Sequence, residues 1–371
     1  MTKKYFFSLI LFVLLSFLLV SCTTGSVVEK PVKIGFLGPL SGDAAGVGQN
    51  SRAAVEIAVN EINNAGGING RPLEVIYEDS RCNAKDAVTA AQKLVNIDGV
   101  VAIIGGFCSS ETIAAAPIAE GKTVMISPGS SSPDVSYAGD YIFRTFPSDV
   151  FQGKFAAGFA YDELGARKIA TLYCLSDWCV ALNKRFQQEF ESLGGEIILE
   201  QGYEQTTKDL RAPLIKIKDL NPDLIYFLGY TEATIIGFQQ LKELEINIPV
   251  LGSDTWTDPG VQEKLGSTID GALFAYQFTP ENEEFKHKMK AHTGSDEVTV
   301  CTPNAYDATR ILAGVMRKVG TNPEDIKNAL YRVKYQGLTG EITFDKYGDV
   351  NTANYVAMQF KDGEMVEYGE Q

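Results

Sequence analysis

The sequence predicts an α/β fold of two lobes, each a parallel sheet flanked by helices. From Val32 onward, short β-branched and apolar runs alternate with longer runs of helical periodicity. Strands that are apolar throughout and separated by single helices are typical of parallel sheets covered on both faces. The chain of 371 residues is also longer than one hydrophobic core usually supports. We therefore expect two lobes rather than one.

Residues 1–21 have the pattern of a signal peptide. Two lysines precede an apolar run from Tyr5 to Val20, which is short for a membrane span of about 20 residues. The run ends in "LVSC", which resembles a bacterial lipobox and implies that Cys22 becomes the lipidated first residue. Residues 22–31 then form a tether. We expect an extracytoplasmic protein held on the bacterial membrane by this lipid only; an ordinary secretory signal is the alternative.

The expected strands are short and apolar, and they lie at 32–38, 73–79, 100–106, 123–127, 168–174, 195–203, 223–230, 249–254 and 271–278. Helices are expected between them. Residues 51–67, for example, carry apolar side chains on one face and end in the stop signals Gly66 and Gly67, and residues 84–99 form a similar run.

The alternation is interrupted in three places, which we interpret as crossings between the lobes. The first lies within residues 136–157, where Arg144, Pro147 and Asp149 break the pattern. The second follows residue 278, and the third lies near residues 340–360, where two short strands flank a polar turn. The crossings divide the chain into lobe I, residues 32–148 and 279–345, and lobe II, residues 149–278 and 346–371.

The charge balance excludes some partners. The formal net charge is −14, and it approaches −16 when Lys3 and Lys4 leave with the signal peptide. So acidic a chain is not expected to bind nucleic acid or anionic lipid headgroups.

Motifs of common enzyme classes are missing from the sequence. The two histidines, His287 and His292, form no HExxH pair, and no GxSxG elbow occurs. The "GKT" at 121–123 lacks the upstream glycine of a P-loop, "GVGQNS" at 46–51 is one glycine short of GxGxxG, and "DKYGD" lacks calcium-loop spacing. We expect a binding protein rather than an enzyme, with no catalytic residue, cofactor or metal.

The cysteine pattern suits an exported protein, in which disulfides persist. Cys174 and Cys179 could bridge across the loop "CLSDWC", and Cys82 and Cys108 could meet at neighbouring strand ends. Cys301 is then left over. Spacing alone does not fix these pairs.

Two serine-rich segments follow strands in the first half of the chain. In "GFCSSETIAAA", Ser109 and Ser110 directly precede or begin a helix. One of them is expected to be an N-cap, while the other hydroxyl and the helix amides could hold a ligand carboxylate. In "VMISPGSSSPDV", Gly129, Ser130 and Ser131 offer hydroxyls, amides and carbonyls that suit a zwitterion, although capping alone is the alternative.

Aromatic and acidic residues follow strands in the second half. Trp178 lies in "CLSDWC", Tyr230 in "LGYTEATI", and Asp254 and Trp256 in "LGSDTWTD". Ligands of open α/β sheets bind at the carboxyl ends of strands. Asp254 could therefore neutralise a ligand ammonium, with Tyr230 and Trp178 closing over the ligand, although any one aromatic could belong to the core.

The segment 32–95, beginning "VKIGFLGPLSGDAAGVGQNS", resembles the opening of the bacterial leucine/isoleucine/valine-binding proteins, substrate-binding components of branched-chain amino acid ABC transporters. The resemblance continues through "CSSETIAAAPIA", "MISPGSSSPD", "LGSDTW" and "GLTGEITFDKYGD". It implies the type I periplasmic-binding-protein fold, in which three strands join two lobes that close over a ligand.

The resemblance also implies roles for individual residues. Ser109 would bind the α-carboxylate of an amino acid with help from Ser131, which stands where the family often has threonine. The carbonyl of Gly129 and the carboxylate of Asp254 would take the ammonium, Tyr230 and Trp178 would contribute from the second lobe, and Cys82 would pair with Cys108. Asp254 in place of a longer glutamate, Val47 in place of an aromatic, and the Cys174 to Cys179 loop depart from the family pattern.

We expect a lipid-anchored receptor that binds an amino acid, aliphatic or branched-chain, and hands it to the permease of an ABC transporter. One alternative is a lipoprotein of the same fold that acts as a sensor or regulator. Another is a receptor for an amide, urea or an aromatic acid. A hydrolase that uses Cys108 or a serine would need a general base, which the sequence does not supply.

Overall fold

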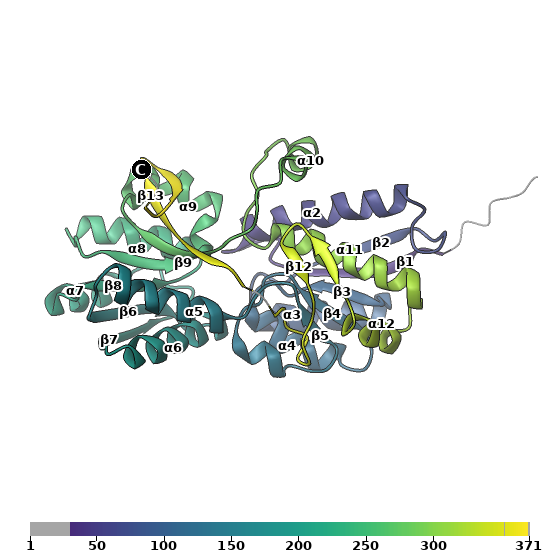
Figure 1. Cartoon of the computed structure of the whole chain (residues 1–371), viewed down its shortest axis with the longest axis horizontal. Helices are drawn as coiled ribbons and strands as arrows, with labels where there is room; N and C mark the ends of the chain where they lie inside the picture. Colours follow the sequence, from purple (N-terminus) through teal and green to yellow (C-terminus); the bar gives the residue numbers. More distant parts are fainter. Residues whose placement is uncertain (1–29, 352, 370–371) are drawn as a thin grey trace, which may run out of the picture. The chain divides into compact units, whose positions relative to one another are not determined.

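The computed structural model describes residues 30–351 and 353–369, so the signal peptide and Cys22 lie outside the described residues. A five-stranded sheet forms the first lobe, with the strand order β2-β1-β3-β4-β5 and all pairs parallel. Its strands are β1 (Val32–Gly38), β2 (Leu73–Asp79), β3 (Ala102–Gly105), β4 (Val124–Ser127) and β5 (Ile142–Arg144) (Figure 1).

A seven-stranded sheet forms the second lobe, with the order β14-β13-β10-β9-β8-β6-β7. Its strands are β6 (Lys168–Cys174), β7 (Glu196–Tyr203), β8 (Leu224–Leu228), β9 (Val250–Ser253), β10 (Leu273–Gln277), β13 (Tyr355–Lys361) and β14 (Glu364–Glu367). The sheet is parallel from β7 to β10 and ends in an antiparallel hairpin. Asp362 and Gly363 turn this hairpin with positive φ angles of 53° and 79°, as the favoured two-residue turns require. A short pair, β11 (Tyr335–Gly337) and β12 (Gly340–Ile342), lies apart from both sheets.

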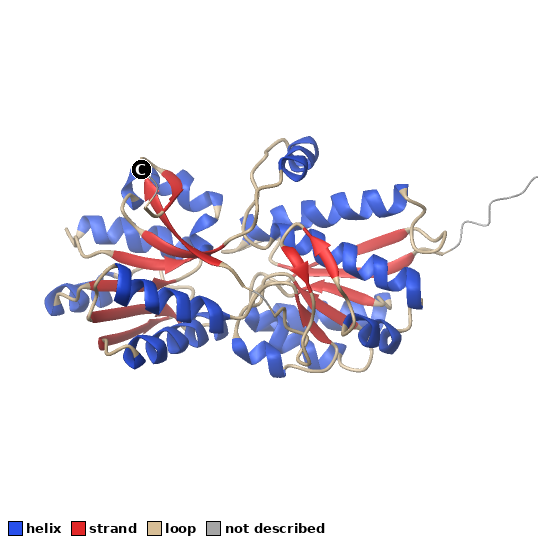
Figure 2. Cartoon of the chain, viewed as in Figure 1, coloured by secondary structure: helices blue, strands red, loops and turns tan. Residues whose placement is uncertain are grey.

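Helices cover both sheets (Figure 2). The α-helices are α2 (Ala45–Asn64), α3 (Ala84–Lys93), α4 (Ser109–Ala119), α5 (Asp149–Gly158), α6 (Asp177–Ser192), α7 (Arg211–Leu220), α8 (Thr231–Glu243), α9 (Pro259–Leu265), α10 (Glu283–Thr293), α11 (Thr302–Val319) and α12 (Pro323–Leu330). Short 3₁₀ or π turns are η1 (Leu94–Asp98), η2 (Pro133–Tyr137), η3 (Phe159–Glu163), η4 (Asp254–Thr257) and η5 (Gly266–Ile269). None of the helices in the described part is long and apolar enough to cross a membrane.

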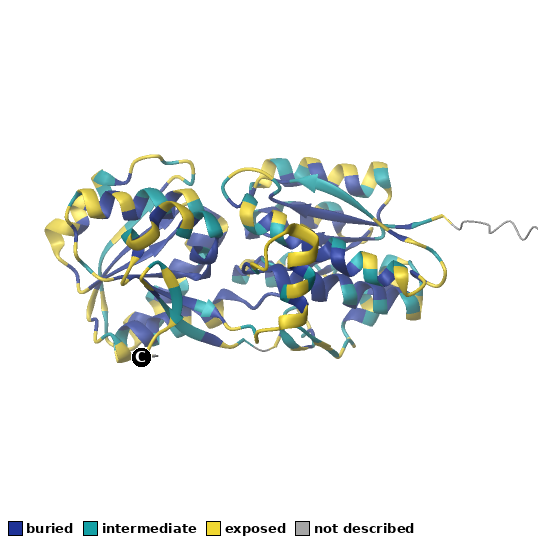
Figure 3. Ribbon diagram, turned by 90° about the horizontal axis from the view of Figure 1, so that it is seen from above, coloured by how far each residue is buried: buried dark blue, intermediate teal, exposed yellow. Residues whose placement is uncertain are grey.

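The alternation of side chains along each strand builds two cores in the first lobe. Ile34 and Phe36 face one side, where α2, α11 and α12 pack, while Leu37 faces the other side with α3 and α4. Both faces are therefore buried, as Figure 3 shows for the strands, and outward helix faces remain exposed. This double cover explains why the strands read as apolar throughout the sequence.

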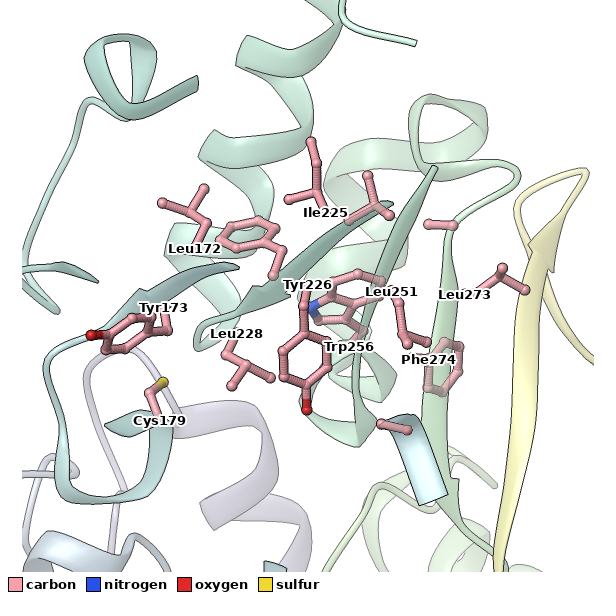
Figure 4. Packing of buried hydrophobic residues seen from close by; sticks show 14 of the residues in the cluster. Leu172, Tyr173, Cys179, Ile225, Tyr226, Leu228, Leu251, Trp256, Leu273 and Phe274 are labelled. Atoms are coloured by element: carbon pink, nitrogen blue, oxygen red, sulfur yellow. The ribbon is translucent and has the colours of Figure 1, made fainter. Parts of the chain in front are cut away.

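The core of the second lobe is rich in aromatic residues. Trp256 is fully buried and packs edge-on against Phe238 and near Phe274 (Figure 4). A Cβ on Gly252 would lie only 2.1 Å from its indole ring, so strand β9 needs a glycine there. Trp256 is thus wholly a core residue, whereas the other tryptophan, Trp178, is buried in the same cluster at its edge and also lines a pocket.

The chain crosses between the two sheets after β5, after β10 and before β13. The last crossing comes later than the sequence suggested. Val350 belongs to the core of the first lobe, and the carbonyl of Gly348 accepts a hydrogen bond of 2.9 Å from the Arg144 amide. The segment 348–350 therefore packs with the first sheet, and the crossing follows Val350 rather than Asp345.

The expected strands are present with small shifts at their ends, whereas β5, β11 and β14 were not expected. These three strands have only three or four residues each, too few to display a clear period.

Candidate functional site

A pocket lies where the carboxyl ends of strands from both sheets face one another. Its volume is about 70 Å³. It is lined by Pro39, Ala44, Val47, Phe107, Cys108, Ser109, Gly129, Ser131, Phe146, Trp178, Tyr230, Asp254, Thr255, Val300 and Cys301. Hydroxyls and a carboxylate therefore meet mainly apolar walls, which is the usual composition of a small-molecule site.

Six of the seven predicted ligand-binding residues line this pocket, and Ser130 does not. The hydroxyl of Ser130 is buried and donates to the carbonyl of Gly106 at 3.0 Å, and it also contacts the Thr112 hydroxyl at 2.8 Å. The Ser130 side chain thus supports the backbone of the neighbouring strand end, while its neighbour Ser131 faces the pocket.

Ser109 is the first residue of α4, and Cys108 is its N-cap. The expectation that a serine caps this helix is wrong, because the carboxylate of Glu111 instead accepts hydrogen bonds from the amides of Phe107 and Cys108, at 2.7 and 2.9 Å. The Ser109 hydroxyl accepts a bond of 3.1 Å from the Ser132 amide, which links the two serine-rich segments. Its own proton remains free to donate to a ligand.

The second serine-rich segment is held close against the first. A Cβ on Gly129 would lie 2.8 Å from the carbonyl oxygen of Phe107 and 3.0 Å from the Sγ of Cys301, so only glycine fits without displacement. Ser132 caps the short helix η2 by accepting from the Asp134 amide at 3.3 Å. Capping thus explains Ser132, while Gly129 and Ser131 stay at the pocket wall.

Trp178 and Tyr230 form the aromatic wall on the second lobe. Their ring centroids are 5.1 Å apart and the rings are tilted by 46°. Trp178 lies in the first turn of α6, which Ser176 caps by accepting from the Cys179 amide at 3.2 Å. Burial raises the pKa of Tyr230, and the Ser176 side chain lowers it, so Ser176 also lies beside the tyrosine hydroxyl.

Asp254 brings a buried carboxylate to the end of β9. Its side chain is 4% exposed, and its Oδ2 has no hydrogen-bond partner among the described residues. Burial raises the pKa of Asp254 to about 7, and the Gln152 side chain opposes this shift. A buried acceptor without a partner is costly, so Asp254 is poised to receive a cation or a donor.

Asp149 is a second such carboxylate, and sequence reasoning missed it. Neither of its oxygens accepts a hydrogen bond of full geometry from any described residue. Burial raises the pKa of Asp149 to about 8, and the Ser131 and Trp178 side chains, which both line the pocket, lower it. Repulsion from Asp254 raises it further. Asp149 begins α5 at a crossing rather than after a strand, and its only sequence signal was the break in the pattern.

A family described as "Periplasmic binding protein" matches residues 31–364 of the chain. The chain belongs to the periplasmic binding protein family. Members of this family are binding proteins rather than enzymes, and the same holds for this chain.

Curated relatives of this periplasmic binding protein cover nearly its whole length. A leucine-, isoleucine-, valine-, threonine- and alanine-binding protein of Pseudomonas aeruginosa is 29% identical over 350 residues, which are 92% of this chain and 93% of the relative. A Leu/Ile/Val-binding protein of Escherichia coli K12 is 26% identical over 329 residues, 87% of this chain and 89% of the relative.

Solved structures agree with the fold. The leucine-binding protein LivK of Thermotoga maritima is 27% identical with a TM-score of 0.84, and the match covers 91% of this chain and 98% of LivK. LivJ of Streptococcus pneumoniae, solved in complex with isoleucine, is 26% identical with a TM-score of 0.83 and the same coverage. A Rhodopseudomonas palustris protein in complex with 3,4-dihydroxybenzoic acid, at 22% identity and a TM-score of 0.81 over 91% of this chain and 96% of that one, supports the fold alone.

Two disulfides flank the pocket of this periplasmic binding protein. Cys82 pairs with Cys108 and Cys174 with Cys179, with Cα atoms 5.4 and 5.5 Å apart. Both expected pairs are therefore present, and neither cysteine of either pair is a free nucleophile. Cys301 is buried and unpaired. Burial raises its pKa well above the ordinary value, so its thiol stays neutral at the pocket wall.

Proposed function

We propose that this periplasmic binding protein is the receptor of an ABC transporter for α-amino acids with small aliphatic side chains. The observation that carries the proposal is the buried carboxylate of Asp254, whose Oδ2 has no hydrogen-bond partner among the described residues, together with the hydroxyls of Ser109 and Ser131 at one pocket. A zwitterion carries an ammonium and a carboxylate at a fixed spacing. A site with a carboxylate at one end and hydrogen-bond donors at the other recognises both groups, and so distinguishes a zwitterion from a simple acid or amine.

The carboxylate end of the ligand is assigned to the first lobe. Ser109 and Ser131 offer hydroxyl donors, and the first turn of α4 adds free amides with partial positive charge. The ammonium is assigned to Asp254, with Asp149 behind Ser131 as a second carboxylate and the Gly129 carbonyl as an acceptor. An ammonium has three donors, of which Asp254 and the Gly129 carbonyl at the pocket wall can accept two directly.

The walls that remain for the side chain are apolar and close. Ala44, Val47, Phe107, Phe146 and Val300 line the pocket without charge or amide groups. Apolar walls favour an aliphatic side chain and leave a polar one without partners. The names of the Pseudomonas aeruginosa relative and of LivK, and the isoleucine bound to LivJ, support the same class of ligand.

Ligand capture would work through a shift between conformations. Ser109 and Ser131 come from the first lobe, and Trp178, Tyr230 and Asp254 from the second. A ligand that contacts both groups stabilises the conformation in which they are close together.

Delivery to a permease and anchoring by lipidated Cys22 complete the proposal. Incorporation of labelled palmitate in the wild type and its loss in Cys22→Ser would test the anchor.

The ligand class is tested by thermal shift with a panel of amino acids, amides, urea and benzoates, because a ligand of the folded state raises the melting temperature. Leucine, isoleucine, valine or alanine is expected to give the largest shift.

Asp254→Ala and Ser109→Ala should weaken binding roughly 10- to 100-fold, since each removes a hydrogen bond to a charged group. Asp270→Asn, remote from the pocket, is the matched control. Binding of benzoate or an amide in preference to amino acids would refute the proposal.

A further inference from the structure

Two helices that flank the pocket begin without a capping side chain of their own. α2 starts after Ala44, which has no polar atom to offer, and α8 starts after Tyr230, whose side chain makes no cap within the described structure. The first amides of a helix need acceptors from elsewhere. Ala44, Val47 and Tyr230 all line the pocket, so these two helix starts close it from opposite lobes.

The acceptor for α8 comes from the other lobe. The Oδ1 of Asp43, in the loop before α2, accepts a hydrogen bond of 2.7 Å from the amide of Glu232, the second residue of α8. The residues are 189 positions apart in sequence. Burial raises the pKa of Asp43, and Lys208, which forms an ion pair with Glu232, opposes this shift, so a cation partly balances the acids there.

The residue that faces the start of α2 is Asp258, which follows η4 in the second lobe and is buried. Its Oδ1 accepts from the Gly260 amide at 2.9 Å and caps α9. Its Oδ2 lies 2.6 Å from the position that a Cβ would take on Gly46, in the first turn of α2. Burial raises the pKa of Asp258, and its Oδ2 has no hydrogen-bond partner among the described residues, so this oxygen is available to the first turn of α2.

We propose that Asp43 and Asp258 form a latch between the lobes, in which Asp43 caps α8 of the second lobe and Asp258 presents its unpartnered Oδ2 to the first turn of α2 in the first lobe. The latch rests on the proposed function, because it holds the lobes together around the ligand. Neither residue lines the pocket, so both are positioning residues. Ligand release would require both contacts to separate, and the latch therefore slows dissociation rather than speeding association.

The first test does not depend on ligand. Hydrogen exchange of the Glu232 amide should be roughly tenfold faster in Asp43→Ala than in the wild type, because the amide loses its acceptor. Asp43→Asn keeps an acceptor oxygen and a good capping side chain, and its exchange should stay close to that of the wild type. Equal exchange in the wild type and Asp43→Ala would overturn the latch.

The second test follows leucine dissociation by stopped-flow fluorescence of Trp178. Asp43→Ala should dissociate roughly tenfold faster with an unchanged association rate, whereas Asp43→Asn should be near normal. Gly46→Ala should also dissociate faster, because its Cβ meets the Asp258 carboxylate. The matched control is Gly158→Ala on α5, whose Cβ meets nothing within 4 Å.

The outcomes separate the latch from the proposed function. If no amino acid binds but the Glu232 exchange pattern is observed, the function fails and the latch stands. If leucine binds and leaves the wild type, Asp43→Ala and Gly46→Ala at one rate, the latch is refuted and the receptor assignment stands.

Discussion

Asp149 and Asp254 are buried, and both oxygens of Asp149 and one of Asp254 have no hydrogen-bond partner among the described residues. Burial raises the pKa of Asp254 to about 7 and that of Asp149 to about 8, and Arg144 opposes the shift at Asp149. A ligand ammonium beside them favours their charged forms and lowers both pKa values. Under the proposed function, binding is therefore linked to the release of protons from this pair.

We predict that leucine affinity rises with pH between about 5.5 and 8, because the pair must lose protons that it holds in the free protein. Calorimetric titrations in buffers of different ionisation enthalpy should show proton release near neutral pH. Asp254→Asn should weaken binding and flatten the pH dependence. A dissociation constant that is equal at pH 5.5 and 8 would contradict a role for these carboxylates.

The folding stability of the ligand-free protein has the opposite pH dependence to the ligand affinity. Both aspartates have folded-state pKa values above the value of about 4 expected in an unfolded chain. The folded state therefore binds more protons than the unfolded state, and stability falls as the pH rises from about 4 to 8. Added ligand should offset this loss, which makes the ligand-induced melting shift larger at pH 8 than at pH 5.5.

Neighbouring serines show what sequence could and could not resolve at this scale. The serine-rich strand ends predict Ser109, Gly129 and Ser131 as ligand-binding residues, and all three line one pocket. Ser130 was grouped with them, but adjacent side chains of an extended segment point in opposite directions, and Ser130 supports the Gly106 carbonyl instead. Composition indicates the segment, whereas the backbone conformation decides which hydroxyl reaches the ligand.

At the scale of elements, the Cys174–Cys179 disulfide spans the start of α6. It encloses Ser176, which caps the helix, and Trp178, which lines the pocket. The disulfide therefore restrains a cap and an aromatic wall within the same turn. The other bridge, Cys82–Cys108, joins the loop after β2 to the N-cap of α4 over a longer separation of 26 residues, against 5 for Cys174–Cys179.

We predict that the two disulfides differ in their contributions. Chain-entropy scaling gives about 2 kcal/mol for the short loop and about 3.5 kcal/mol for the long one. Cys82→Ala/Cys108→Ala should thus lower the melting temperature more than Cys174→Ala/Cys179→Ala, measured by calorimetry without ligand. The latter variant should lose leucine affinity several-fold because Trp178 becomes less ordered. If both double variants had the same melting temperature and Cys174→Ala/Cys179→Ala bound leucine as tightly as the wild type, the two disulfides would not differ in this way.

Elements with many residues were predictable, and those fixed by tertiary pairing were not. The strands β1, β2 and β6 have seven residues each and match the expected ranges. The edge strand β14 was not expected, although Asp362 and Gly363 form a recognised hairpin signal. Its four residues gain stability only by pairing with β13, which itself depends on the distant strand β10.

At the scale of the whole molecule, the contacts that join the lobes come from positions far apart in the chain. Asp43 with Glu232 is an example; Arg144 with Asp349 likewise joins distant segments, but within the first lobe, and neither pair has a local sequence pattern. Periodicity reports which face of an element is buried, but it does not identify the partner across a crossing. The two-lobed architecture could therefore be predicted from the sequence, while the residues that couple its parts could not.

The Arg144–Asp349 pair carries the last prediction. Arg144 is 0% exposed; its Nε and terminal nitrogen each lie 2.7 Å from an Asp349 oxygen, and it donates to the Ser132 carbonyl at 2.8 Å. The pair thus fixes the serine segment to the chain just before the last crossing. Asp349→Ala leaves a buried cation unpaired, so we expect a loss of about 3 kcal/mol in denaturant unfolding, together with weaker leucine binding. Arg144→Lys should not restore the bidentate contact. Arg144→Met/Asp349→Leu should be more stable than Asp349→Ala, because no unpaired charge remains. If the losses of unfolding free energy in Arg144→Met and Asp349→Leu sum to the loss in the double variant, the two residues act independently and the pairing is refuted.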